Sequence, residues 1–391
     1  MGVIQQTRPS PASKSGYLHG LDGWRAVAIL GVMMTHDQPW ILAGHSNKPW
    51  QFVGGLGVEL FFAISGFLIC TRILEEETRL GHFRLKAFYV RRVLRIQPAA
   101  LVYLATIAIL MAAGVVMGSW HQWRGALFLY NNYLYHPNDM SLAYTGHFWT
   151  LSVEEHFYLL LSLLLFTIRR RRIAVFASLL IALLFAQHAC RSHNLNTIEA
   201  SRQTFWMIQY LFFAALVALL VRVPMIREGA TRFLHPWVAF CVVIAVVLAD
   251  FARGQGGILG HSWWSIVGEQ APHISYGFTL LVIATTFHPR SWTTRFLELR
   301  WLRWLGRLSY SLYLWHVLFL IPSHPGIHVT NRFLLFLAER PWKYAAALLV
   351  AMASYYWIEK PLMRLGHRLA PPVTPGHRDL GGGVVPAELS S

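Results

Sequence analysis

Apolar runs of roughly 20 residues recur along almost the whole sequence, and they constrain the fold more than any other feature. A run of that length can cross the hydrocarbon core of a bilayer as a helix. Only 13% of the residues are charged, against about 25% in a soluble domain, so the chain cannot cover itself with polar surface in water. Ten segments have this character: 24–42, 54–71, 98–118, 148–168, 173–190, 204–221, 233–250, 272–288, 308–322 and 342–358. The sequence predicts an all-α, polytopic membrane helical bundle of about ten transmembrane helices.

The net charge of +16 is concentrated in alternate loops. Retained cytoplasmic loops of membrane proteins are enriched in Lys and Arg. The rich loops contain Arg72, Arg79, Arg84, Lys86, Arg91, Arg92 and Arg95; then Arg169 to Arg172; then Arg222, Arg227 and Arg232; then Arg290, Arg295, Arg300, Arg303 and Arg307. Each intervening loop holds one or two cations, so a single orientation satisfies every loop and places both termini in the cytoplasm. The charge is thus explained by topology, and we predict no nucleic-acid partner.

One folded domain accounts for the chain. We predict a polar, disordered cytoplasmic N-terminus over 1–16, unlike a cleaved signal peptide, and a membrane domain over 17–369. Residues 370–391 are rich in Pro and Gly, which predicts a disordered cytoplasmic tail. The cysteines lie in or at the ends of apolar spans, without metal or redox spacing: Cys70, Cys190 and Cys241. We expect buried apolar residues there and no metal site.

The first predicted span contains two ionisable side chains, Arg25 and His36. An ionisable side chain inside a membrane costs several kcal/mol and usually faces a cavity or a partner. Arg25 is near the predicted cytoplasmic end, and His36 follows eleven residues later, about 16 Å further along a helix. Eleven residues is close to three turns, so one helical face carries a cation at the inner edge and an imidazole in the outer half.

Other spans place polar groups at matching depths. Arg92 and Arg95 are three residues apart, and therefore share a helical face at the inner start of a span, just before Pro98. The sequence places four further groups in outer parts of their spans: Glu59, Glu154, Tyr313 and His316. This arrangement predicts a guanidinium cluster at the cytoplasmic mouth and a His/Glu cluster in the outer half of the bilayer.

These groups suit catalysis but do not require it. Guanidinium groups bind phosphate and carboxylate in bidentate fashion, and imidazole is the usual general base near neutral pH. The arginines also fit topology determinants that meet lipid headgroups, the glutamates fit side chains that reach water, and His316 fits an interfacial aromatic belt. A proton-coupled transporter or flippase that uses His36 and the buried glutamates as a relay fits equally well. Charge and periodicity alone leave enzyme and transporter open.

Six segments resemble the bacterial membrane acyltransferase family 3, which includes O-acetyltransferases of lipopolysaccharide, exopolysaccharide and peptidoglycan. In the order of the family they are Leu21 to His36, Gly57 to Ile69, Phe88 to Pro98, Trp149 to Tyr158, Leu308 to His316 and Trp357 to Pro361. The resemblance places the family's Arg-x10-His pattern on Arg25 and His36 and its Arg-x-x-Arg pattern on Arg92 and Arg95. It ties these residues to catalysis and to the acyl-CoA donor, and it covers Glu154 and His316.

The resemblance implies an integral membrane O-acyltransferase of the bacterial cytoplasmic (inner) membrane. Its expected donor substrate is acyl-CoA, most simply acetyl-CoA, with no permanently bound cofactor. Its expected partners are membrane lipid and a cell-envelope carbohydrate or glycolipid with a free hydroxyl. His36 would be the general base, or in a variant a transient acyl carrier.

Supporting roles follow from the same hypothesis. Glu154 or Glu59 would hold the ring of His36 in its reactive tautomer, and Tyr313, His316 or the backbone near Gly66 would donate a hydrogen bond to the oxyanion. Three residues depart from the usual family pattern: Trp24, Gln97 and His156. We expect the first two to reshape the donor entrance.

Overall fold

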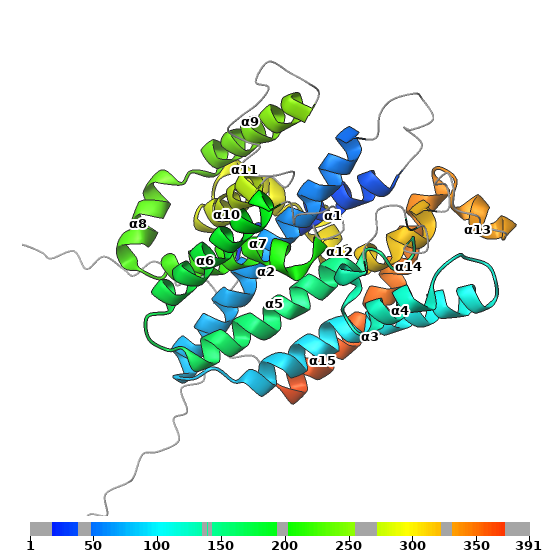
Figure 1. Cartoon of the computed structure of the whole chain (residues 1–391), viewed down its shortest axis with the longest axis horizontal. Helices are drawn as coiled ribbons and strands as arrows, with labels where there is room; N and C mark the ends of the chain where they lie inside the picture. Colours follow the sequence, from blue (N-terminus) through cyan, green and yellow to red (C-terminus); the bar gives the residue numbers. More distant parts are fainter. Residues whose placement is uncertain are drawn as a thin grey trace, which may run out of the picture.

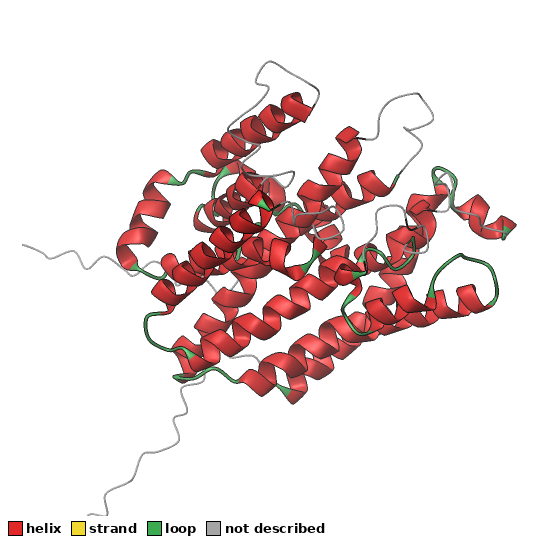
Figure 2. Cartoon of the chain, viewed as in Figure 1, coloured by secondary structure: helices red, strands yellow, loops and turns green. Residues whose placement is uncertain are grey.

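The computed structural model describes residues 18–37, 48–134, 139, 143–193, 202–254, 272–321 and 331–371, and within these ranges the regular structure is entirely helical (Figure 2). The longer helices are α1 Leu21–His36, α2 Lys48–Leu80, α3 Leu85–Ala112, α5 Phe148–Thr167, α6 Arg172–Ser192, α7 Thr204–Leu220, α9 Pro236–Gly254, α10 Pro272–Phe287, α12 Arg300–Leu320 and α14 Trp342–Ala353. The shorter helices are α4 Trp120–Leu127, η2 Asn131–Tyr133, α8 Pro224–Phe233, α11 Trp292–Leu297, α13 Arg332–Leu337, η6 Ser354–Glu359 and α15 Lys360–Leu369.

Each of the predicted apolar spans overlaps one of the longer helices. Four helices in the described part of the chain are long and apolar enough to cross a membrane: Gly54–Leu80 within α2, then α3, α5 and α6. The pair α7 and α8 is bent by 106° and would add a fifth if it forms one span, and α9 and α10 contain shorter apolar helices. The all-α membrane fold is therefore supported, whereas the count of ten spans and the location of the termini stay predictions.

Helix α1 lies against both α2 and α12 (Figure 1). Helix α2 in turn packs on α7, α10 and α5, and α3 runs beside α15 along one edge of the molecule. The predicted termini at 1–16 and most of 370–391 lie outside the described residues. Arg25 and His36 on α1 are both partly buried in these contacts.

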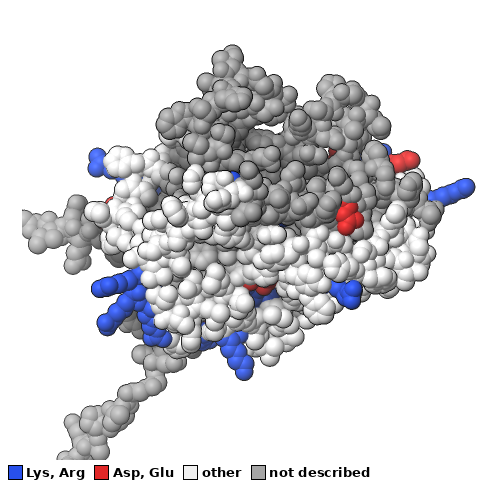
Figure 3. All heavy atoms as spheres, in the orientation of Figure 1, with Lys and Arg blue, Asp and Glu red and all other residues white. Residues whose placement is uncertain are grey.

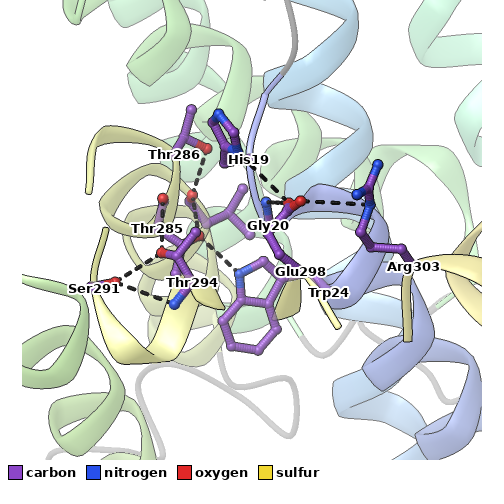
Figure 4. Close-up of polar contacts among 10 residues, drawn as sticks. His19, Gly20, Trp24, Thr285, Thr286, Ser291, Thr294, Glu298 and Arg303 are labelled. Atoms are coloured by element: carbon purple, nitrogen blue, oxygen red, sulfur yellow. Dashed lines mark hydrogen bonds and ion pairs between the residues drawn. The ribbon is translucent and has the colours of Figure 1, made fainter. Parts of the chain in front are cut away.

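Polar contacts fix the start of α1 against α10, α11 and α12 (Figure 4). The backbone N–H of Gly20, whose φ of 80° is left-handed, donates to Glu298 Oε1 at 2.7 Å. Trp24 is buried and its Nε1–H donates to Thr285 Oγ1 at 3.0 Å (Figure 4). Trp24 does not line the central cavity described below, and its effect on a donor entrance stays a prediction. Its large ring is accommodated in the contact between α1 and α10.

Several exposed cations lie along one edge of the molecule, and a few others lie elsewhere on the visible surface (Figure 3). Figure 3 shows Lys and Arg side chains along the lower left edge, near the loop that joins α5 to α6, while most of the visible described surface is uncharged. Arg169, Arg170 and Arg171 in that loop are all exposed. A band of uncharged surface beside a cationic edge is the pattern expected of a protein that lies across a bilayer.

The close approach of α1 and α12 requires glycine at one position. A Cβ atom added to Gly306 would lie 1.7 Å from the backbone oxygen of Asp22. Backbone atoms of two packed helices cannot move aside as a flexible side chain can. We predict that Gly306→Ala lowers the free energy of unfolding by about 3 kcal/mol, the upper end for overpacking, as measured by thermal unfolding of the purified protein in detergent.

Gly55→Ala is the matched control, because a Cβ atom there meets nothing within 4 Å. Alanine is favoured over glycine within a helix by up to about 1 kcal/mol, so this variant should unfold at the wild-type temperature or slightly above it. Equal unfolding temperatures for the two variants would show that α1 and α12 are not packed this closely.

Candidate active site

A cavity with about 850 Å³ of empty space, including its open mouth, lies between α1, α2, α3, α5 and α12. We name it the central cavity. Its polar lining residues include Arg25, Ser65, Arg92, Arg95, Glu154, Tyr158, Tyr310 and Tyr313. Five of the predicted site residues thus share one space: Arg25, Arg92, Arg95, Glu154 and Tyr313. The sequence had placed these groups on four separate spans.

Arg92 is enclosed by groups from α5. Its Nη2 lies 3.9 Å from Glu154 Oε2, and its Nε lies 3.6 Å from Glu155 Oε1. The guanidinium carbon also lies 3.1 Å from the centre of the Tyr158 ring, a cation–π contact. Arg92 therefore ties α3 to α5, and its charge is already matched by two carboxylates.

Glu154 belongs to this arginine group and not to the histidine group. Its carboxylate accepts hydrogen bonds from Ser65 Oγ at 3.0 Å and from the Tyr158 hydroxyl at 2.6 Å. The prediction that Glu154 lies at the outer edge, remote from Arg92, is wrong, because the two side chains are in contact. The physical reason is that α3 begins at Leu85 rather than near Pro98, so Arg92 lies inside a long helix that passes α5. Glu59 interacts electrostatically with Tyr210 on α7 and does not line the central cavity.

Arg25 and Arg95 bring two further positive charges to the central cavity. Arg25 Nη1 lies 3.3 Å from Asp22 Oδ1, one turn earlier in α1. Arg95 is exposed, and it lines both the central cavity and a second cavity beside it, so its guanidinium is accessible to whatever enters either space. Of the two arginines in the Arg-x-x-Arg pattern, Arg95 is the accessible one and Arg92 the ion-paired one.

The second cavity, which we name the arginine cavity, has about 1140 Å³ of empty space and lies between α2, α3 and α15. Its cationic lining residues are Arg72, Arg79, Arg91, Arg92 and Arg95. It shares Ile69, Arg92 and Arg95 with the central cavity, so the two spaces adjoin at these side chains. Arginines thus lie along a path from the predicted cytoplasmic loops to the central cavity.

Helix α15 contributes His367 to the arginine cavity, which sequence reasoning missed. Burial, and then the positive charges of Arg91 and Arg95, hold the pKa of His367 below its ordinary value. Burial is the larger cause of this shift, and the cavity lining also includes Glu75 and Glu76, which pair with Arg72 and Arg91. The signal in the sequence was the amphipathic segment 360–369, which follows the last apolar span.

His36 and His316 lie side by side at the far end of α1. His36 Nδ1 is 3.3 Å from His316 Nε2, and the ring centres are 4.8 Å apart. Neither ring lines the central cavity. The connecting residue is Tyr313, which lines the cavity and whose ring centre is 5.8 Å from that of His316.

The Tyr313 hydroxyl is held by neighbours from the start of α5. It donates to the His147 carbonyl at 2.7 Å and is paired with Thr150 Oγ1 at 2.6 Å. Its proton is therefore engaged, and it reaches an oxyanion only by giving up the bond to the carbonyl. His147 is also buried, and its ring centre lies 6.0 Å from that of His316. Sequence reasoning missed His147, although it directly precedes the Phe148-Trp149 motif.

The outer end of α1 is anchored by a buried ion pair that sequence reasoning also missed. Asp37, the residue after His36, pairs with Lys343 and accepts a hydrogen bond from the Tyr344 hydroxyl. Arg340 Nη2 lies 2.7 Å from Asp37 Oδ2. Lys343 is 1% exposed, so this contact joins α1 to α14 within the protein interior. The sequence did contain a signal for this ion pair. Lys343 lies at the start of the span 342–358, and Asp37 lies at the matching end of the first span.

Comparison with known proteins identifies the chain. A family model described as "Acyltransferase domain" (Acyl_transf_3) matches residues 18–360. The chain belongs to this acyltransferase family. Membership of this family favours acyl transfer over the transporter alternative. Its apolar helices agree with the membrane setting that the family resemblance implied. Among the described residues, no group of three or more His, Cys, Asp or Glu could hold a metal ion.

Curated relatives carry O-acetyltransferase names. A Staphylococcus aureus (strain COL) protein named "Putative O-acetyltransferase" is 29% identical over 321 residues, which is 78% of this chain and 50% of the relative. The O-acetyltransferase OatA of Staphylococcus aureus (strain NCTC 8325) is 27% identical over 377 residues, or 90% of this chain and 58% of the relative. The chain thus spans about half the length of these relatives. No solved structure matches it significantly.

Removing the charge of Asp37 should lower the free energy of unfolding. Asp37→Asn leaves Lys343 as a buried charge without its carboxylate, and such a change typically costs about 3–5 kcal/mol of stability. We predict a loss of that size in thermal unfolding, with partial recovery in the double variant Asp37→Asn/Lys343→Met. The control is Glu75→Gln, which breaks the more exposed Arg72 pair and should cost about 1 kcal/mol or less. Equal losses for Asp37→Asn and Glu75→Gln would contradict the anchor.

Proposed function

We propose that the protein transfers an acyl group, most simply acetyl, from cytoplasmic acyl-CoA to a hydroxyl of a cell-envelope carbohydrate or glycolipid. The observation that carries the proposal is the pair of adjoining cavities. Together they lead from an arginine-lined space to Tyr313, which contacts the His316 ring. Family membership supports the acyl transfer, and the printed names of the relatives support an O-linked acetyl group. In this proposal the enzyme lies in the bacterial cytoplasmic membrane and has no permanently bound cofactor.

The donor would enter through the arginine cavity. CoA carries a pyrophosphate and a 3′-phosphate, and guanidinium groups bind phosphate oxygens through charge-assisted, bidentate hydrogen bonds. Arg95 is accessible from both cavities and is the residue we assign to the phosphates. Arg92, held by two glutamates, would instead keep α3 and α5 in place around the donor. Arg25 lines the central cavity and would meet the pantetheine arm.

The acyl carbonyl would stop near Tyr313, at the end of the central cavity closest to the histidines. His36 would take the proton of the acceptor hydroxyl, whose oxygen then attacks the thioester carbon. Alternatively, His36 would itself carry the acyl group between donor and acceptor. Hydroxyls of Thr150 and Tyr313 lie at this end and would serve the developing oxyanion once the Tyr313 bond to the His147 carbonyl is released.

Removing the proposed base tests the function. We predict that His36→Ala lowers kcat by about 10²–10⁴-fold, the usual contribution of a positioned proton acceptor. The assay follows CoA release from acetyl-CoA with a thiol-reactive dye, using solubilised lipopolysaccharide, exopolysaccharide and peptidoglycan fragments as acceptors. Mass spectrometry of the acceptor must show the mass of one added acetyl group.

The matched control is His188→Ala, which removes an exposed histidine from α6 that lines neither cavity. It should retain the wild-type rate and confirm that the assay is insensitive to histidine removal as such. Wild-type turnover by a correctly inserted His36→Ala protein would end both versions of the mechanism.

The two arginines of the Arg-x-x-Arg pattern should behave differently. We predict that Arg95→Gln raises KM for acetyl-CoA by about tenfold, equivalent to about 1.4 kcal/mol of binding, and leaves KM for the acceptor unchanged. Arg92→Gln should lower stability as well, because it leaves Glu154 and Glu155 without their cation. Arg169→Gln, in an exposed loop, is the control. An equal rise in donor and acceptor KM for Arg95→Gln would argue against the donor assignment.

A further inference from the structure

His36 is held between two groups that accept hydrogen bonds. Its Nδ1 lies 2.9 Å from the Val32 carbonyl oxygen, one turn earlier in α1. The same nitrogen lies 3.3 Å from His316 Nε2 on α12, with the two rings inclined at 71°. A carbonyl oxygen can only accept, so the Val32 contact requires a hydrogen on His36 Nδ1, and His316 Nε2 is the second group that this hydrogen faces.

The tautomer of His316 is fixed by its own helix. Its Nδ1 lies 3.0 Å from the Leu312 carbonyl oxygen and 2.9 Å from the Tyr313 carbonyl oxygen. Carbonyl oxygens only accept hydrogen bonds, so Nδ1 of His316 must carry a hydrogen and donate it. A neutral imidazole with its hydrogen on Nδ1 presents a lone pair on Nε2.

The surroundings of His316 favour the neutral form of its imidazole. Its side chain is completely buried, and among the described residues no carboxylate forms an ion pair with it. The carboxylates that could have served are engaged elsewhere: Glu154 with Ser65, Tyr158 and Arg92, and Asp37 with Lys343. A buried charge without a partner is strongly disfavoured, so His316 Nε2 keeps its lone pair and faces His36.

We propose that His316 is a positioning residue for the catalytic base: together with the Val32 carbonyl it holds the His36 ring in the orientation and tautomer that place the basic lone pair on Nε2. With acceptors on both sides of it, Nδ1 of His36 must carry the hydrogen, which places the lone pair of the neutral ring on Nε2. This inference rests on the proposed function of His36 as general base. It assigns to a histidine the orienting role that we had expected from Glu154 or Glu59, and it removes His316 Nε2 from the candidate oxyanion donors.

The reaction step then has defined atoms. The proton of the acceptor hydroxyl passes to Nε2 of His36 as the acceptor oxygen forms its bond to the acyl carbon. The carbon–sulfur bond breaks, and the thiolate of CoA receives the proton from Nε2. While His36 is an imidazolium, its Nδ1–H remains hydrogen bonded to Val32 O and His316 Nε2, so the transient charge meets two acceptors.

The tautomer can be observed directly in the wild-type protein. The full chain, labelled with ring-¹⁵N histidine and placed in nanodiscs, would be studied by solid-state NMR, with His36 assigned by comparison with His36→Gln. We expect a protonated Nδ1 and an unprotonated Nε2 on His36. The opposite tautomer would overturn the proposal, and this result depends on neither activity nor the folding of a His316 variant.

Two variants of His316 separate positioning from packing. His316→Gln can place an amide oxygen near the position of Nε2 and keep an acceptor for His36, whereas His316→Leu fills similar space without one. We expect His316→Leu to lower kcat at least tenfold while KM for acetyl-CoA changes less than twofold. We expect His316→Gln to recover a substantial part of that loss. Equal kcat for the two variants, or wild-type kcat for His316→Leu, would overturn the positioning role.

The outcomes distinguish this inference from the function on which it rests. Loss of turnover in His36→Ala together with full turnover in His316→Leu would refute only the role of His316. Full turnover in His36→Ala would refute the role of His36 itself, whatever the tautomer found by NMR.

Discussion

The contact between α1 and α12 is the constraint on which the site depends. Gly306 lets the two helices approach until the backbone at Asp22 fills the space that a side chain would occupy. Further along the same pair of helices, His36 and His316 come within hydrogen-bonding distance. The start of α1 is bound to Glu298 and its end to Lys343, so both Arg25 and His36 lie on a helix fixed at each end.

Several buried charges among the described residues are paired with a nearby opposite charge. These pairs distinguish arginines that hold helices together from an arginine that is accessible from the cavities. Arg92 meets two glutamates, and Asp37 meets a lysine and an arginine, as a low-dielectric interior requires. Arg95 lies where the two cavities adjoin and is accessible to both. Positive charge that can bind an anionic ligand is therefore separated, by one helical turn, from positive charge that holds the structure together.

The sequence predicted the helices well because apolar length is a direct consequence of the bilayer. It also predicted that Arg25, Arg92, Arg95, Glu154 and Tyr313 are site residues, and these do line one cavity. It misplaced Glu154 because charged residues hid the first turns of α3, which a search for apolar runs discards. It missed His367 because α15 is amphipathic, and it missed His147 because a residue before a helix shows no periodicity. Which residues of different helices contact one another depends on how the helices pack, and the sequence of one span does not determine that packing.

A histidine suits the position beside His36 better than a carboxylate would. An ionised carboxylate in the bilayer interior needs a cation of its own, and each such pair carries a desolvation cost. Two neutral imidazoles need no counterion, and in the proposed mechanism a charge would exist between them only while His36 holds a proton during turnover. The carboxylates of this protein lie instead beside guanidinium and ammonium groups. The same dielectric argument thus explains both the Glu154 contact with Arg92 and the pairing of His36 with His316.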